Sequence, residues 1–394
     1  MSDVSYFAKT ASRPSHKPFG IKQADRLFHL HVIGKTGTGK TSLLETLIRQ
    51  DIDVGHGCAL IDPHGDLALR VLAYARDKRK DVIYLDAADL HTPYGYNPLR
   101  VIAPQYIPLA VSGLMETFKK RFADAWGVRM EHVLRNTLFA ILESGGGALP
   151  DVLAMLVDDD FRKARVAKIR NETVRAFWEE EFPKYSSRYK VESIAPIQNK
   201  IGAFLADPRM RRIVCEPPID LSLRRAMDAG QVLIFNLAKG TVGEDSASLL
   251  GALLLTTFGL AAYSRANIAE DKRRPFYLHV DEFQAFTTQA IADMISELRK
   301  YALALTVAHQ HKDQLEDAVW HALIGNCGTL ISFRVGAEDA RLLSKEFMDV
   351  VSVEDLVGLS NYAIYLKLMI DGMPSRPFKA MTLAPAAGVH HADR

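Results

Sequence analysis

A glycine-rich segment that ends in lysine and threonine has the residue types that bind phosphate. Residues 34–41 match the pattern G-x-x-x-x-G-K-[ST] at every position. The glycines of such a loop let backbone N–H groups close around phosphates, and the N-terminus of the following helix adds a favourable dipole. The predicted phosphate-binding residues are Gly34, Lys35, Thr36, Gly37, Thr38, Gly39, Lys40 and Thr41. Lys40 is expected to reach the β- and γ-phosphates, and the Thr41 hydroxyl is expected to ligate Mg²⁺.

The flanks of this loop support the same interpretation. Residues 27–33 form an apolar run typical of a strand, and residues 41–48 have the pattern of an amphipathic helix. Strand, loop and helix in this order are the context that confirms the motif. The alternative is a chance glycine-rich turn, which eight matching residues and both flanks disfavour. The sequence therefore predicts that the chain binds a nucleoside triphosphate with Mg²⁺.

An acidic pair follows a buried strand much later in the chain. Residues 276–280 are apolar enough for a strand, and Asp281 and Glu282 come directly after it. Asp281 is expected to hold Mg²⁺, and Glu282 is expected to polarise the attacking water. Acidic residues after strands are often only solvated. Downstream of a complete phosphate-binding loop, the catalytic interpretation is favoured.

The next predicted strand ends close to a glutamine. In a parallel sheet the end of the strand at 303–308 lies beside Asp281, so Gln310 is expected to contact the γ-phosphate or the attacking water. The alternative is a polar strand end with no chemical role. A metal site at His309 and His311 is disfavoured, because residues two apart point to opposite faces and no third ligand is evident.

Phosphoryl transfer also benefits from an added cation, often an arginine from a neighbouring subunit. We predict Arg334 for this catalytic role, since it interrupts an apolar strand. Such an arginine either projects into a subunit interface or pairs with a carboxylate inside the fold. Arg299 and Lys300 are the other candidates, and a solvated helix face is the simpler interpretation of Lys300.

Bulk composition excludes few functions. The chain has 394 residues, of which 48% are hydrophobic and 24% are charged, as in an ordinary globular protein. Its net charge of +2 neither requires nor excludes binding to nucleic acid. Three well-separated cysteines indicate a reducing compartment without disulfides. The N-terminus lacks the apolar core of a signal peptide, and we expect no apolar run long enough to span a bilayer. We expect a cytoplasmic protein without its own transmembrane segment, attached to a membrane only through partners.

Alternating strand and helix patterns predict an α/β fold with a mostly parallel central sheet. Strands are predicted at 27–33, 58–62, 82–86, 232–237, 276–280, 303–308 and 330–335, and helices at 40–50, 66–76, 245–265 and 291–300. A hairpin is predicted around Asp371 and Gly372. The expected domains are a leader (1–26), a core in two parts (27–105 and 223–394) and an all-helical insertion (106–222).

These motifs together resemble the HerA/FtsK group of P-loop ATPases, and within it the soluble motor domain of TraG/TraD-type conjugative coupling proteins of type IV secretion. The segments that carry the resemblance are 34–41, 60–66, 97–99, 194–201, 280–284, 296–301, Gln310, 326–329 and 333–335. The most specific feature is Asp62-Pro63-His64-Gly65-Asp66 combined with a helical insertion ahead of the late acidic strand.

The resemblance implies a RecA-like core, an inserted helical domain and assembly into a hexameric ring that hydrolyses ATP between subunits and translocates DNA, single- or double-stranded. By position, the resemblance implies that Lys40 and Thr41 bind phosphate and Mg²⁺ and that Gln310 senses the γ-phosphate. The chain departs from membrane-bound coupling proteins in lacking N-terminal transmembrane helices. The alternatives are a protein-substrate assembly or secretion ATPase, and a HerA-like ring that scaffolds a nuclease or defence effector. Expected partners are a relaxase, a secretion channel or a nuclease.

One basic segment is the best candidate for DNA contact. Residues 119–121 read Lys-Lys-Arg, with Phe118, Phe122 and Trp126 nearby. Aromatic rings could stack on the bases of a single strand, and lysine and arginine contact phosphates. The competing interpretation, favoured by residue type, places these aromatic residues in the core of the insertion.

Overall fold

The computed structural model describes residues 3–11 and 17–385. The chain divides into two compact units. The sheet unit contains residues 1–84, 224–236 and 265–394, and the helical unit contains residues 85–223 and 237–264. The predicted division into a leader, a core in two parts and an insertion stays a prediction. Parts of the predicted leader, at 1–2 and 12–16, lie outside the described residues.

The sheet unit is built on one sheet of eleven strands. In spatial order they are β2 (Pro18–Lys22), β1 (Val4–Thr10), β15 (Phe378–Thr382), β12 (Ala363–Lys367), β11 (Thr329–Ser332), β3 (Leu30–Ile33), β10 (Leu303–His309), β9 (Phe276–Val280), β4 (Gly57–Asp62), β8 (Val232–Asn236) and β5 (Val82–Asp86). The six strands from β11 to β8 are parallel to one another. The predicted α/β fold with a mostly parallel sheet is confirmed.

Sequence composition explains why β8, β9 and β10 lie inside the sheet, each between two other strands. Every residue of β8, β9 and β10 is buried, and the three strands read as nearly continuous apolar runs. Strands covered on both faces have this pattern, whereas a strand with one wet face alternates. Because β3, β9 and β10 are parallel, their carboxyl ends meet at one edge of the sheet, where the predicted site residues follow them.

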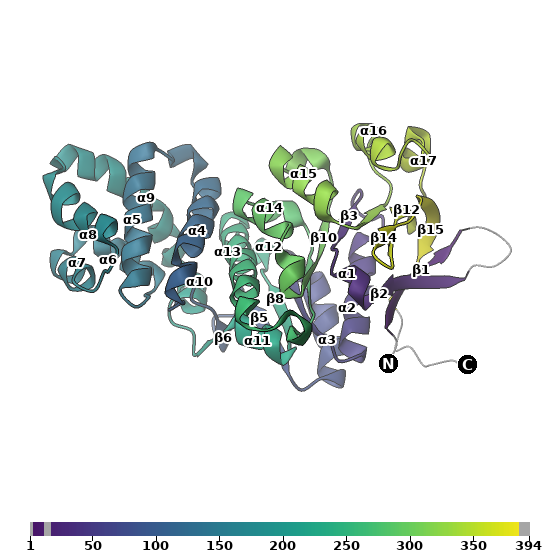
Figure 1. Cartoon of the computed structure of the whole chain (residues 1–394), viewed down its shortest axis with the longest axis horizontal. Helices are drawn as coiled ribbons and strands as arrows, with labels where there is room; N and C mark the ends of the chain where they lie inside the picture. Colours follow the sequence, from purple (N-terminus) through teal and green to yellow (C-terminus); the bar gives the residue numbers. More distant parts are fainter. Residues whose placement is uncertain (1–2, 12–16, 386–394) are drawn as a thin grey trace. The chain divides into compact units, whose positions relative to one another are not determined.

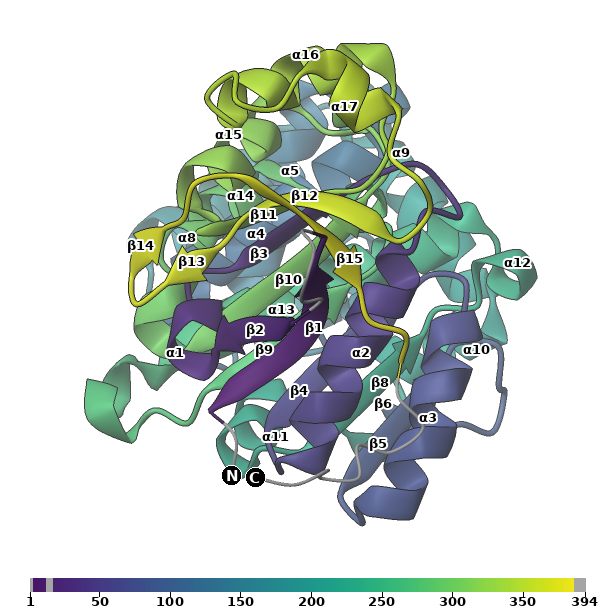
Figure 2. The same ribbon diagram turned by 90° about the vertical axis from the view of Figure 1, so that its right-hand side faces the viewer.

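Helices of the sheet unit follow its strands. They are α1 (Gln23–Arg26), α2 (Lys40–Asp53), α3 (Asp66–Lys78), α11 (Leu223–Ala229), α14 (Gln289–Ile295), α15 (Asp317–Asn326), α16 (Ala337–Glu346) and α17 (Val353–Val357). Helices α2 and α3 pack against each other and on β4 (Figure 2). Apolar side chains of α2 such as Leu43, Leu44 and Leu47 are fully buried there. This packing fixes the start of α2, which is the end of the phosphate-binding loop.

The first described residues belong to the sheet. β1 pairs antiparallel with β15, which lies at the opposite end of the sequence, and β2 pairs with β1 (Figure 2, purple beside yellow). Phe7 and Ala8 are fully buried. The polar, basic sequence with prolines predicts a leader here, whereas the partner strand of β1 lies more than 350 residues away. Pairing over that separation leaves no local pattern.

The predicted hairpin around Asp371 and Gly372 is confirmed. It joins β13 (Met369–Ile370) to β14 (Met373–Pro374). Asp371 and Gly372 have φ values of 51° and 78°. Two central residues with positive φ are the requirement of a tight turn whose twist matches that of the flanking strands.

The helical unit consists of helices and two short strands. Its elements are β6 (Tyr94–Gly95), α4 (Ile107–Arg121), α5 (Val128–Glu143), α6 (Leu149–Val157), α7 (Asp159–Val166), α8 (Glu172–Ala176), a π-helix (Phe177–Glu181), α9 (Ser187–Ala206), α10 (Pro208–Val214), β7 (Ile219–Asp220), α12 (Lys239–Val242) and α13 (Glu244–Tyr263). Helix α5 packs against both α4 and α9 (Figure 1). The predicted helix 245–265 corresponds to α13, which packs against α4.

Helix α13 is unusually apolar. With its continuation to Asn267 it is long and apolar enough to cross a membrane by length and composition alone. Within its most apolar window, 78% of the residues are buried inside the structure. That burial is typical of the core helix of a globular unit.

Candidate functional site

The phosphate-binding loop is anchored to the two strands that flank β3. The N–H of Gly34 donates to the carbonyl of His309 at 3.3 Å, and the N–H of Lys35 donates to the carbonyl of Arg334 at 2.8 Å. Residues 34–39 connect β3 to α2, as predicted. The loop is thus held at the carboxyl edge of the sheet, with α2 starting at Lys40.

Gly39 shows why this loop requires glycine. Its φ is +122°, and a Cβ at this position would lie 2.9 Å from Cδ1 of Tyr362. The backbone of Tyr362 also contacts the loop: its N–H donates to the carbonyl of Thr38 at 2.8 Å. A side chain at position 39 would therefore be strained twice, by backbone conformation and by crowding.

The Lys40 side chain lies inside the loop. Its Nζ donates to the carbonyls of Gly34 at 2.6 Å and Lys35 at 3.1 Å, and the residue is only 5% exposed. Burial lowers the pKa of Lys40, and the negative charges of Glu282 and Asp281 oppose that shift. A cation held among carbonyl oxygens can exchange them for phosphate oxygens, which are stronger acceptors.

The loop and the acidic strand end meet at Thr41 and Asp281. The Thr41 hydroxyl donates to Oδ2 of Asp281 at 3.1 Å. Burial first, then the charges of Glu282 and Asp62, raises the pKa of Asp281 to about 6. A buried carboxylate whose charged form is unfavourable, beside a hydroxyl, suits a divalent cation. Among the described residues no group of three or more His, Cys, Asp or Glu could hold a metal. Mg²⁺ with phosphates needs fewer, since it commonly takes one or two carboxylates and keeps waters.

Gln310 bridges the loop and the acidic pair. The Thr36 hydroxyl donates to Oε1 of Gln310 at 2.9 Å, and Nε2 of Gln310 donates to Oε1 of Glu282 at 2.8 Å. The other carboxylate oxygen of Glu282 accepts from Nε2 of Gln284. Glu282 has a φ of 46°, and a non-glycine residue in this region is typical of functional sites. The structure thus brings Lys40, Thr41, Asp281, Glu282 and Gln310 to one place.

Arg334 lies beside the loop of its own chain. Its guanidinium donates to the carbonyl of Leu359 at 3.2 Å and to Oδ1 of Asn361 at 3.0 Å. It follows the end of β11, which stops at Ser332, so it does not interrupt the strand. Arg299 stacks on Phe28, with the guanidinium carbon 3.4 Å from the ring centroid. Supply of either arginine to a neighbouring subunit stays a prediction.

Three contacts of this site were not expected from the sequence. Gln284 holds Glu282, Tyr362 covers the loop, and Asp62 lies near enough to raise the pKa of Asp281. The Asp62 carboxylate accepts from the backbone N–H groups of His64 and Ala68, both at 2.9 Å. A signal for Asp62 was present, since it ends a strand as Asp281 does. The contact of Tyr362 depends on the chain return after β11, which has no local signature.

Two of the three aromatic residues beside Lys119–Arg121, Phe118 and Phe122, belong to the core of the helical unit. Phe118 and Phe122 are 0% and 3% exposed and stack on each other with centroids 5.3 Å apart. Trp126 donates from Nε1 to Glu131 at 2.8 Å. The core interpretation is confirmed for Phe118 and Phe122, which leaves neither ring free to stack on a base.

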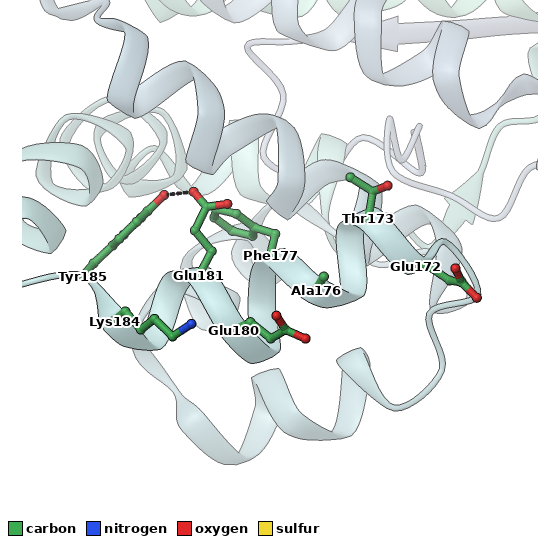
Figure 3. A pocket seen from close by; sticks show the side chains of 8 residues that line it. All are labelled: Glu172, Thr173, Ala176, Phe177, Glu180, Glu181, Lys184 and Tyr185. Carbon is green, nitrogen blue, oxygen red and sulfur yellow. Dashed lines mark hydrogen bonds between the residues drawn. The ribbon is translucent and has the colours of Figure 1, made fainter.

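A hollow of about 650 Å³ lies elsewhere, on the helical unit (Figure 3). Its lining residues are Glu172, Thr173, Ala176, Phe177, Glu180, Glu181, Lys184 and Tyr185. None of the predicted phosphate-binding residues is among them. Three carboxylates against a single lysine make this hollow unfavourable for a triphosphate. The chemistry of the phosphate-binding loop, and not cavity size, therefore locates the nucleotide site.

Comparisons with known proteins agree with this architecture. A family model described as the TraM recognition site of TraD and TraG matches residues 275–350. That segment contains Asp281, Glu282, Gln310 and Arg334. No curated protein sequence matches the chain.

Solved structures match over nearly the whole chain. The bacterial conjugative coupling protein TrwBdeltaN70 in its unbound form has a TM-score of 0.66 at 16% identity, over 98% of this chain and 90% of that chain. The plasmid coupling protein TrwB in complex with ADP and Mg²⁺ has a TM-score of 0.66 at 17% identity, over 100% and 98%. VirB4 of Thermoanaerobacter pseudethanolicus has a TM-score of 0.64 at 14% identity, over 99% and 98%.

These similarities confirm the resemblance predicted from the motifs. At such identities the solved structures show the fold, which is the RecA-like P-loop NTPase fold with helical insertions. The matched segment adds a likeness to TraD and TraG around the acidic strand.

Proposed function

We propose that the protein is an ATP-hydrolysing ring motor that translocates DNA in conjugative transfer, type IV secretion or a related DNA-processing task. The observation that carries the proposal is the chain of contacts from Thr36 through Gln310 to Glu282, which joins the phosphate-binding loop to the acidic strand end. A motor needs such a link, because the state of the γ-phosphate must change the position of neighbouring elements.

Each residue of the site has a proposed part in hydrolysis. Lys40 binds the β- and γ-phosphates, and Glu282 orients and polarises the attacking water. Thr41 and Asp281 hold Mg²⁺, which when bound neutralises charge on the phosphates. Gln310 contacts the γ-phosphate or the attacking water. Thr36 and Gly37 are exposed and supply backbone N–H groups for the phosphates, whereas the N–H of Lys35 is bonded to Arg334.

The similarity to TrwB in complex with ADP and Mg²⁺ supports ATP and Mg²⁺ as ligands here. The fit of the residues supports it independently. Asp281 is buried, and no cationic side chain of the described residues makes a hydrogen bond with it, so a divalent ion relieves its desolvation. The Thr41 hydroxyl already points at the same carboxylate.

Assembly into a hexamer places ATP between subunits and gives Arg334 its proposed role. The guanidinium is held by Leu359 and Asn361 of its own chain, and Asn361 is exposed. To reach a neighbouring site, Arg334 must leave at least one of these two acceptors. We therefore propose that subunit contact and release of Asn361 occur together.

DNA is proposed as the cargo on the strength of the similarity to conjugative coupling proteins. Contacts to phosphates by lysine and arginine would be independent of sequence and sensitive to salt. The proposed partners are a relaxase or a secretion channel, and the proposed location is the cytoplasm, with membrane attachment through partners. The alternatives are a protein-substrate secretion ATPase and a ring that scaffolds a nuclease.

A displacement assay tests the proposed activity directly. A third strand annealed to duplex DNA should be released by the protein with ATP and Mg²⁺, and by neither the protein alone nor the Glu282→Gln variant. A protein that hydrolyses ATP with DNA present but releases no strand on any tested duplex or single-stranded track would contradict translocation. Stimulation by a partner polypeptide and not by DNA would favour the protein-substrate alternative.

A further inference from the structure

Two buried histidines contact each other beneath the phosphate-binding loop. His31 lies on β3 and His309 on β10, and their Nε2 atoms are 2.7 Å apart. The two ring planes are nearly parallel, at 12°, with centroids 4.9 Å apart, and Trp320 of α15 packs edge-on against both. Both histidines are 0% exposed.

The hydrogen bonds fix the tautomer of each ring. Nδ1 of His309 lies 3.2 Å from the carbonyl oxygen of His311, which can only accept, so this Nδ1 carries the proton. Nε2 of His309 is then an acceptor, and Nε2–H of His31 donates to it. The remaining Nδ1 of His31 is an acceptor that has no hydrogen-bond partner among the described residues.

Both rings are neutral at ordinary pH, as this arrangement requires. Burial lowers the pKa of His31, with a smaller contribution from His309. Burial also lowers the pKa of His309 to about 3, and the charges of Lys40 and His311 add to the shift. A second proton on His309 would sit on its Nε2 and place two N–H donors face to face.

The bond from His309 to His311 closes the backbone around Gln310. On one side of this turn the carbonyl of His309 accepts from Gly34 of the loop at 3.3 Å. On the other side the N–H of Lys312 donates to Oδ1 of Asp339 at 3.0 Å. Gln310 is thus the one residue between two anchored neighbours, and its side chain contacts Thr36 and Glu282.

We propose that His31 and His309 are positioning residues for Gln310: the chain of bonds from His31 to His309 to the His311 carbonyl sets the turn that aims Gln310 at the γ-phosphate site. The inference rests on the role proposed above for Gln310. It also accounts for the polar pair itself, because two apolar residues would pack between β3 and β10 without an unpaired acceptor.

Two conservative variants separate positioning from packing. His309→Asn keeps an N–H donor near the place of Nδ1, whereas His309→Gln keeps one near the place of Nε2 and loses the bond to His311. We expect His309→Gln to lower kcat for ATP about tenfold to a hundredfold, the scale of a misplaced catalytic group, while KM changes little. His309→Asn should retain most of kcat. Equal losses of kcat in both variants would overturn the proposal.

His29 provides a matched control. It is also buried and makes two hydrogen bonds, to Ile295 at 3.0 Å and from the N–H of Leu305 at 3.1 Å, neither of which touches the turn at Gln310. His29→Asn suits the left-handed backbone there, with its φ of 65°. It should lower stability and leave kcat unchanged at temperatures where the protein is folded.

Two further measurements keep the inference separate from the proposed function. Nitrogen-15 NMR of the ring of His309 should report the Nδ1–H tautomer whether or not the protein hydrolyses ATP, and the Nε2–H tautomer would overturn the proposal. In a Gln310→Ala background, His309→Gln should cause no further loss of kcat, because both changes remove the same contact. Additive losses would likewise contradict positioning. Unaltered hydrolysis in Gln310→Ala with the Nδ1–H tautomer retained would reject the role of Gln310 and leave the hydrogen-bond chain as observed.

Discussion

The hydroxyl of Thr41 and the carboxylate of Asp281 lie 3.1 Å apart across 240 positions of sequence. This contact joins the start of α2 to the end of β9, and it makes one site of two motifs. Asp281 is 6% exposed, and its pKa is raised to about 6. The ionised form of Asp281 is therefore disfavoured at the place where Mg²⁺ is proposed to bind.

Asp281→Asn should stabilise the protein in the absence of Mg²⁺ while abolishing hydrolysis. The pKa of Asp281 rises from 3.8 to about 6, so the fold favours the protonated acid. Its contribution to the free energy of unfolding is greatest below pH 4, falls as pH rises toward 6, and is constant above that. Two pKa units correspond to about 2–3 kcal/mol. In urea denaturation, the gain of the variant at pH 8 should be about twice the gain at pH 5.

Mg²⁺ provides the control for this prediction. Added Mg²⁺ should raise the stability of the wild-type protein at pH 8 and leave Asp281→Asn nearly unchanged. An asparagine variant that is less stable than wild type at pH 8 without Mg²⁺ would contradict the assigned environment of Asp281.

Glu282→Gln should retain ATP binding and lose turnover. Gln310 and Gln284 donate to the two carboxylate oxygens of Glu282, and the replacement amide offers only one acceptor. The variant has no carboxylate to polarise water, so we expect kcat to fall at least about a hundredfold. A fluorescent ATP analogue should bind within about threefold of wild type, a difference below 1 kcal/mol. Turnover close to that of the wild-type protein would refute the assignment.

The positions of strands near the site were predictable, because each of these strands is a short apolar run that is visible in the local sequence. Apolar runs predicted β5 and β9 with the bounds that the structure has, and glycines with Lys40 predicted the loop. The contacts across strands were partly predictable, since parallel strands end at one edge of a sheet. Gln310 beside Glu282 follows from that rule.

Other parts depend on contacts between distant residues. The pairing of β1 with β15 and the cover of the loop by Tyr362 both require the chain to return from its far end. The tautomers of His31 and His309 depend on a neighbouring carbonyl and not on residue type. The aromatic residues near Lys119 could not be divided between core and surface without their packing, which buries Phe118 and Phe122.

Replacing one member of the buried pair of Arg26 and Asp51 should destabilise the sheet unit strongly. Both side chains are 0% exposed, and His279 also contacts Asp51, at 3.0 Å. The Arg26 guanidinium pairs with both carboxylate oxygens of Asp51. Arg26→Met leaves a buried carboxylate without its cation, which costs about 3–5 kcal/mol. Thermal unfolding checks this loss.

An exposed ion pair gives the comparison. Lys22 and Asp371 pair at the surface, with side chains 48% and 65% exposed. Lys22→Ala should change the midpoint of thermal unfolding little, because exposed pairs are weak. If Lys22→Ala and Arg26→Met lowered the midpoint of thermal unfolding by similar amounts, the larger contribution proposed for the buried pair would be contradicted.

Mixed rings test Arg334. Arg334→Ala subunits and Glu282→Gln subunits are each expected to be inactive alone. If Arg334 acts on the neighbouring site, a mixture contains interfaces with one intact Glu282 and one intact Arg334, and ATP hydrolysis should partly recover. Recovery should peak at intermediate mixing ratios. Flat activity at all ratios would place the role of Arg334 in its own chain, with Leu359 and Asn361.

The most direct measurement is the rate of ATP hydrolysis with and without DNA, at two salt concentrations, with Lys40→Ala as the negative control. We predict that single- or double-stranded DNA stimulates hydrolysis by the wild-type protein and that the stimulation weakens at the higher salt, because phosphate contacts release counterions. Lys40→Ala should be inactive under all conditions. Hydrolysis that is insensitive to both kinds of DNA at both salt concentrations would contradict a DNA-translocating motor.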